Sequence, residues 1–204
     1  MGYTAIIDYG VGNLKSVSNA LAYLGVDSEI TGDPCRLELA DAIILPGVGA
    51  FPDAADKLRE SGLEQILLRQ AGNKPILGIC LGMQLLFQWG EEGRRCEGLG
   101  LISGGVRRIE TDLKLPHIGW NSLTFPRPSP LCRGLDEGCC VYFVHSFCGH
   151  TEDPDQEAAV TDYGGPVLAA VQDAARGVFG CQFHPEKSGE TGLAILQNFA
   201  ALNR

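Results

Sequence analysis

Three short apolar segments in the first half of the chain each run directly into a glycine-containing turn. They cover residues 4–8, 42–45 and 75–79, and a further β-strand candidate covers residues 27–31. Continuous apolar runs of this length are typical of strands that are buried on both faces, as in a parallel sheet. The chain must therefore supply helices that cover both faces of such a sheet.

Helical patterns do separate these segments. Apolar residues recur at helical spacing over residues 14–24 and 81–89. Pro52 can open a third helix over residues 52–70, which we expect to be interrupted near Gly62. Alternating strands and helices predict right-handed βαβ crossovers, and hence a doubly wound, mainly parallel α/β sheet flanked by helices, of the flavodoxin-like kind.

The second half of the chain has a different pattern, with strands and little helix between them. Candidate strands cover residues 106–109, 139–144, 167–171 and 177–183, and a final helix covers residues 191–202. These strands predict an antiparallel β extension of the sheet. The length of 204 residues and the absence of a long linker indicate a single domain over residues 1–204.

Composition excludes several classes of protein. The net charge of −9 disfavours binding to nucleic acid or to an anionic membrane, because both need a positive surface. The sequence contains neither a membrane-spanning apolar run nor a secretory leader, so we expect a soluble cytoplasmic protein. Its 8 cysteines include no Cys-x-x-Cys pair, and it lacks a Gly-x-x-x-x-Gly-Lys phosphate loop. We therefore expect no metal and no cofactor.

Cys80 is the strongest candidate for a catalytic residue. It stands between a predicted strand and a predicted helix in the segment Gly78-Ile79-Cys80-Leu81-Gly82. Glycines two residues before and after the central residue permit the tight turn of a nucleophile elbow. The thiol would then lie at a helix N-terminus, and the N–H of Leu81 could donate to a developing oxyanion. On this segment alone, a buried structural cysteine is an equally good interpretation.

His184 and Glu186 are candidates for the base and its orienting acid. They flank Pro185 after the last predicted strand, and side chains two apart in extended chain point the same way. A carboxylate beside the imidazole would select its tautomer and stabilise the imidazolium. Taken singly, each residue could equally be structural, but the elbow and the pair together favour a Cys-His-Glu triad.

These motifs resemble those of the class I, or triad, glutamine amidotransferases, over nearly the whole chain. Within that family the chain is most similar to glutaminases that serve a (β/α)₈-barrel cyclase. Five segments carry the resemblance: residues 8–17, 45–51, 116–121, 142–146 and 183–188.

The resemblance implies a role for each matching residue. Cys80 would attack the carboxamide of L-glutamine, His184 would transfer protons and Glu186 would orient it. The remaining implied residues are Gly47, Val48 and Gly49 with Leu81 for the oxyanion, and Gln84, His145, Ser146 and Phe147 for the substrate. The family usually has Tyr where this chain has Phe147, so any contact through a phenol hydroxyl is lost here.

The resemblance also implies a partner protein. Ammonia is largely protonated at neutral pH, so it must pass directly to a docked synthase, here the (β/α)₈-barrel cyclase as the second subunit of a heterodimer. Trp120 and Lys187 resemble residues at that contact, although core packing is an alternative for Trp120. Three other interpretations stay open: a sister amidotransferase, an α/β-hydrolase with a cysteine elbow, and a non-catalytic scaffold subunit.

Overall fold

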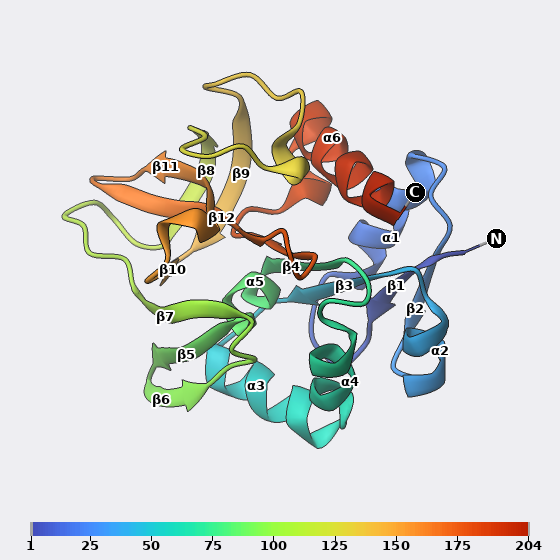
Figure 1. The fold of residues 1–204 in the computed structure, drawn as a ribbon. Helices are drawn as coiled ribbons and strands as arrows, with labels where there is room; N and C mark the ends of the chain where they lie inside the picture. Colours follow the sequence, from blue (N-terminus) through green and yellow to red (C-terminus); the bar gives the residue numbers. More distant parts are fainter. Residues whose placement is uncertain (1, 204) are drawn as a thin grey trace.

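The computed structural model describes residues 2–203, and a seven-stranded sheet lies at its centre (Figure 1). The strand order is β11-β12-β13-β4-β3-β1-β2. From that edge, the strands are β11 Glu157–Asp162, β12 Pro166–Asp173, β13 Val178–Cys181, β4 Ile76–Cys80, β3 Ala42–Gly47, β1 Thr4–Ile7 and β2 Ser28–Thr31. The five strands from β13 to β2 are parallel, whereas β12 pairs antiparallel with both β13 and the edge strand β11. This confirms the predicted mainly parallel sheet with an antiparallel extension.

Helices cover both faces of this sheet (Figure 1). They are α1 Leu14–Tyr23, α2 Pro34–Leu39, α3 Phe51–Glu60, α4 Leu63–Gln70, α5 Leu81–Leu85 and α6 Gly189–Ala200. One core cluster joins α1 and α6 to one face of the sheet, and a second joins α2, α3 and α4 to the other face. The expected interruption falls at Gly62, whose φ of 73° separates α3 from α4.

Two smaller sheets lie at the carboxyl side of the central strands. One has the order β10-β7-β5-β6, and the other pairs β8 with β9 in antiparallel register. Their strands are β5 Phe87–Glu92, β6 Arg94–Glu97, β7 Ile102–Arg108, β8 His117–Ser122, β9 Cys140–His145 and β10 Phe147–His150. Short 3₁₀ turns are η1 Pro130–Cys132, η2 Pro154–Gln156, η3 Pro185–Lys187 and η4 Ala201–Asn203.

The predicted helix over residues 81–89 was wrong in its second half. Helix α5 ends at Leu85, and the chain continues as strand β5. Strand β5 pairs with both β6 and β7, and a Cβ atom on Gly90 would lie 2.7 Å from the Phe51 ring. Pairing and packing with distant segments therefore override an apolar pattern that fits a helix locally.

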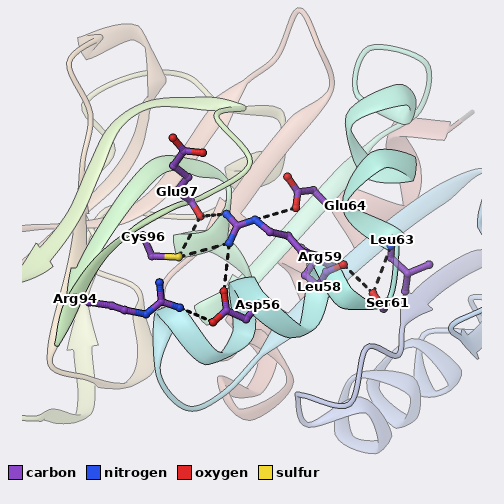
Figure 2. Close-up of polar contacts among 9 residues, drawn as sticks. All are labelled: Asp56, Leu58, Arg59, Ser61, Leu63, Glu64, Arg94, Cys96 and Glu97. Carbon is purple, nitrogen blue, oxygen red and sulfur yellow. Dashed lines mark hydrogen bonds and ion pairs between the residues drawn. The ribbon is translucent and has the colours of Figure 1, made fainter.

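A cluster of polar side chains around Arg59 fixes the β5–β6 hairpin to α3 (Figure 2). The guanidinium lies 3.6 Å from Cys96 Sγ and 3.2 Å from a Glu64 carboxylate oxygen, and it also donates to the Glu97 carbonyl oxygen. Asp56 links Arg59 to Arg94 through two further ion pairs. We call these residues the Arg59 cluster.

None of the helices described over residues 2–203 is long and apolar enough to cross a membrane.

Candidate active site

Cys80 occupies a strained turn between β4 and α5. Its φ of 55° and ψ of −112° lie outside the regions that L-residues ordinarily adopt. Among residues 2–203 it is the one non-glycine residue with a positive φ. Such strain persists only where the surroundings enforce it, and it concentrates at functional sites.

Close backbone contacts enforce this turn. A Cβ atom on Gly82 would lie 1.7 Å from the Leu45 carbonyl oxygen, and one on Gly78 would lie 2.6 Å from the Gly82 carbonyl oxygen. A Cβ on Gly47, at the end of β3, would lie 2.8 Å from the Gly82 nitrogen. The glycines predicted from the elbow pattern are therefore required sterically.

The turn leaves the backbone N–H of Leu81 as the first of helix α5, without an intrahelical acceptor. This N–H is available to an oxygen that carries negative charge beside the thiol.

His184 directly precedes the turn η3, and Glu186 lies within it. His184 lines the same pocket as Cys80. His184 Nδ1 lies 2.8 Å from Glu186 Oε1, and both side chains are almost completely buried. Burial acts to lower the pKa of His184. Hydrogen bonding to the Cys80 thiol and to the Glu186 carboxylate outweighs burial and raises that pKa to about 9.

Two hydrogen bonds hold the segment around η3 against strand β9, and a third closes that segment on itself. The His184 N–H donates to the Tyr142 carbonyl oxygen at 3.0 Å. The Ser188 hydroxyl donates to the His184 carbonyl oxygen at 2.6 Å and accepts from the Tyr142 N–H at 2.9 Å. The imidazole is thus positioned by the adjacent sheet as well as by its own turn.

A cavity of about 370 Å³ opens beside the thiol. It is lined by Val48, Gly49, Cys80, Leu81, Gln84, Glu92, Pro116, Val144, His145, Ser146, Phe147 and His184. The structure therefore gathers around one pocket the candidate nucleophile, the candidate base and all four candidate substrate residues. Of the candidate oxyanion residues, Val48, Gly49 and Leu81 line the pocket, while Gly47 packs against the elbow behind it.

The segment Val48–Ala50 is anchored on both sides. On one side, the Tyr9 hydroxyl donates to the Pro46 carbonyl oxygen at 3.0 Å. On the other, the Phe51 N–H donates to Glu92 Oε2 at 2.8 Å. Between these anchors Gly49 has a φ of 99°, a conformation that favours glycine.

His145 lines the same pocket as His184 and is hydrogen-bonded to His117 behind it. His145 Nδ1 lies 2.8 Å from the Phe147 carbonyl oxygen, which can only accept, so Nδ1 carries the proton. Nε2 of His145 must then accept from His117 Nδ1, at 3.1 Å. The Asn121 amide nitrogen, at 3.3 Å, completes the chain by donating to His117 Nε2.

Both imidazoles of this pair are held neutral. Burial lowers the pKa of His145 to about 4, against the raising effect of the Phe147 carbonyl and with help from the neighbouring His117 and His184. Burial also lowers the pKa of His117, whose ring stacks between Phe143 and Tyr163. A proton on either ring would place two donors face to face.

Trp120 and Lys187 lie outside the pocket, on the surface. Trp120 is 58% exposed on β8, beside the exposed Ile118 and edge-on to the Tyr142 ring, so core packing is excluded for it. Lys187 is exposed on η3, directly after Glu186.

Three residues at or near the pocket were not singled out from the sequence: Glu92, His117 and Gln182. Glu92 follows the predicted helix over residues 81–89, in a segment for which the sequence analysis predicted no element, and it ends strand β5. His117 was left without a role, and Gln182 reaches the Cys80 sulfur with its side chain at 3.8 Å. The sequence signal for Gln182 was its position two residues before His184, on the same side of an extended segment.

The arrangement suits nucleophilic acyl transfer. A thiol and an imidazole line the same pocket, the imidazole is paired with a carboxylate, and Leu81, whose N–H is the first of α5, lines that pocket too. Burial raises the pKa of Cys132 and of Cys148 to about 12, which makes both thiols poor nucleophiles. Among the described residues, no group of three or more His, Cys, Asp or Glu side chains is placed to hold a metal ion.

Comparison with known proteins identifies relatives over the full chain. The family model "Glutamine amidotransferase class-I" matches residues 5–202. A protein of Caldanaerobacter subterraneus subsp. tengcongensis named "Imidazole glycerol phosphate synthase subunit HisH" is 50% identical over 198 residues, covering 97% of each chain. A protein of the same name from Moorella thermoacetica is 47% identical over 98% of this chain and 95% of its own.

A solved structure supports the same fold. The structure of PurLQS from Thermotoga maritima covers 100% of this chain and 99% of its own chain, with a TM-score of 0.79 at 20% identity. At that identity the similarity concerns the fold alone.

Proposed function

The chain belongs to the class-I glutamine amidotransferases, and we propose that it is the glutaminase subunit of an imidazole glycerol phosphate synthase. In this role it hydrolyses L-glutamine to glutamate and ammonia and passes the ammonia to a cyclase. The cyclase uses it to make imidazole glycerol phosphate and aminoimidazole carboxamide ribonucleotide in histidine biosynthesis. The proposal places the protein in the cytoplasm.

The first half of the reaction releases ammonia. Cys80 Sγ attacks the carboxamide carbon of glutamine as a thiolate, its proton being held on His184 Nε2. The negative charge on the carboxamide oxygen is stabilised by the Leu81 N–H and by an N–H of the Gly47-Val48-Gly49 segment. His184 then returns the proton to the departing nitrogen, the C–N bond breaks, and a glutamyl thioester remains on Cys80.

The second half regenerates the nucleophile. A water molecule attacks the thioester carbon while His184 accepts one of its protons. The C–S bond breaks, the sulfur leaves as a thiolate beside the protonated His184, and glutamate leaves. Glu186 stabilises the imidazolium in both halves and keeps Nε2 directed at the sulfur.

Glutamine itself is held by the opposite wall of the pocket. We assign its amino-acid end to Gln84 and to the segment His145-Ser146-Phe147. Phe147 contributes through its backbone and ring, because it has no hydroxyl. The 370 Å³ volume of the cavity accommodates a single amino acid.

The partner is a (β/α)₈-barrel cyclase, which forms a heterodimer with this chain. The two exposed apolar side chains of β8, Ile118 and Trp120, offer it a docking surface, and Lys187 lies on the neighbouring turn. Exposed apolar patches of this kind mark sites of protein association.

One observation carries the enzymatic proposal: Cys80 and His184 line the same pocket, and His184 Nδ1 is paired with the buried Glu186 carboxylate at 2.8 Å. The test is a glutaminase assay of Cys80→Ala, with the cyclase and its ligand present. We expect a loss of at least about 10³-fold, because the covalent route is removed. Cys148→Ala is the matched control and should keep its activity.

Equal rates for Cys80→Ala and wild type would contradict the enzymatic proposal and would mean that the chain is a non-catalytic scaffold subunit. The same assay without the cyclase tests the coupling, since we expect slow turnover by the subunit alone. Full activity without the partner would contradict that part of the proposal.

A further inference from the structure

Gln182 lies directly beside the nucleophile, and no step described above uses it. The residue follows β13, its side chain is fully buried, and its Nε2 atom lies 3.8 Å from Cys80 Sγ. Its Oε1 atom lies 3.0 Å from Gln84 Nε2. A buried amide is costly unless its polar atoms are paired, and here both atoms have partners.

The backbone fixes which way both amides point. Gln84 Nε2 lies 3.0 Å from the Phe147 carbonyl oxygen, which can only accept. The NH₂ group of Gln84 must therefore face that carbonyl and Gln182, so the Gln182 atom that meets it is the oxygen. The Gln182 nitrogen is then directed at the sulfur, and it carries hydrogens to donate.

We propose that Gln182 is a further residue of the catalytic site: its side-chain amide donates to the sulfur of Cys80 and stabilises the thiolate, while Gln84 holds that amide in the donating orientation. A neutral donor lowers the energy of the thiolate without competing with His184 for the proton.

This pairing also connects the nucleophile to the substrate wall. The Phe147 carbonyl accepts from both Gln84 and His145, so the amide that holds Gln182 shares its acceptor with a residue of the substrate wall. The link to glutamine rests on the proposed function. The effect on the thiol does not, because it concerns the protonation of Cys80 alone.

The test measures how fast iodoacetamide alkylates Cys80 at a series of pH values, followed by mass spectrometry of the Cys80 peptide. Gln182→Met preserves side-chain length and removes the donor. We expect the midpoint of the alkylation profile to rise by about one pH unit, and the rate at neutral pH to fall about tenfold. Gln84→Met should shift the midpoint in the same direction by less, because the Gln182 amide loses its orientation.

Gln172→Met is the matched control. Gln172 is a buried glutamine on β12 that donates to the Pro128 carbonyl oxygen, and it does not line the pocket. Its removal should leave the midpoint unchanged. The other titratable groups that interact with Cys80, namely His184 of η3, Tyr9 after β1 and Cys181 of β13, are intact in all three variants.

A wild-type midpoint in both Gln182→Met and Gln84→Met would overturn the proposal, as would an equal rise in Gln172→Met. If Gln182→Met does not fold, Gln84→Met decides on the same readout. Alkylation needs no glutaminase activity, so a chain without that activity would refute the proposed function while leaving this measurement intact. In an active enzyme, we expect Gln182→Met to lower kcat more than it changes KM.

Discussion

The two walls of the pocket each carry a buried imidazole, and the pKa values of the two move in opposite directions. His184, beside a carboxylate and a thiol, has its pKa raised to about 9, although burial alone would lower it. His145, beside a carbonyl oxygen and another imidazole, has its pKa lowered to about 4, with burial as the main cause. Burial is common to both, so the partners decide which ring is charged at neutral pH.

This difference divides the work of the pocket. The charged, carboxylate-held ring is suited to moving protons and to pairing with a thiolate. The neutral ring has both nitrogens committed to fixed partners, which suits it to holding a wall in place. Titratable groups with opposed pKa shifts in one site are a general mark of divided acid–base roles.

The largest effect should come from removing the carboxylate that distinguishes the two walls. Glu186→Gln preserves shape but cannot stabilise the His184 imidazolium, so we expect glutaminase activity to fall about 10²- to 10⁴-fold. The His184 pKa should also fall from about 9. An NMR titration of the imidazole measures this directly.

The same variant has a consequence for stability. Because the folded pKa of His184 is above its ordinary value of 6.5, its stabilisation is complete below that pH and is lost as pH rises through about 9. This alkaline decline in the free energy of unfolding should shrink in Glu186→Gln. An undiminished decline would mean that the carboxylate does not set the charge of His184.

A smaller effect, on the acid side, should come from the other wall. The folded pKa of His145, about 4, is below its ordinary value of 6.5, so the unfolded chain binds a proton first as pH falls. The free energy of unfolding should therefore fall between these two pH values, by about 3 kcal/mol from this group. His145→Gln removes the titrating group. The difference in the free energy of unfolding between wild type and this variant, measured by urea denaturation, should therefore become smaller as pH falls. A constant difference from pH 7 to 4 would contradict the neutral assignment of His145.

The smallest effect should come from the Arg59 cluster (Figure 2), whose ion pairs are partly exposed to solvent. Arg59 and its partners are partly exposed, and such ion pairs contribute about 0–1 kcal/mol each. We expect Arg59→Met to lower the free energy of unfolding by about 1 kcal/mol or less, with unchanged glutaminase activity. Thermal denaturation, with Arg69→Met as the control for a single exposed pair, measures it. A loss of activity would show that the β5–β6 hairpin transmits strain to Glu92.

The elbow was predictable from the sequence because its requirements are local. Gly78 and Gly82 are spaced by the geometry of one tight turn, and His184 and Glu186 are two residues apart. The expected pairing of these two side chains is present, but Glu186 lies in the 3₁₀ turn η3 and not in the extended chain that the prediction assumed. The alternation of apolar runs and helical patterns likewise predicted the central sheet. In each case the deciding contacts lie between neighbours in the chain or follow from a fixed period.

The features that could not be predicted from the sequence depend on contacts between residues far apart in the chain. Residues 87–89 continue a helical pattern, and only the pairing of β5 with β7 makes them a strand. The position of Gln182 beside Cys80 depends on the parallel pairing of β13 with β4, across about a hundred residues. His117 gains its neutral state from the register that sets it opposite His145. No periodicity encodes such pairings.

Strand β8 is one backbone thick, and its two sides face different surroundings. Ile118 and Trp120 point to solvent. His117 and Asn121, on the alternate positions, point inward, where His117 is hydrogen-bonded to His145, the ring that donates to the Phe147 carbonyl oxygen. The two rows of side chains cannot move independently, because they alternate along the same backbone. A protein that displaces Ile118 and Trp120 on binding therefore also displaces His117 and Asn121, because no other layer of structure lies between the two rows.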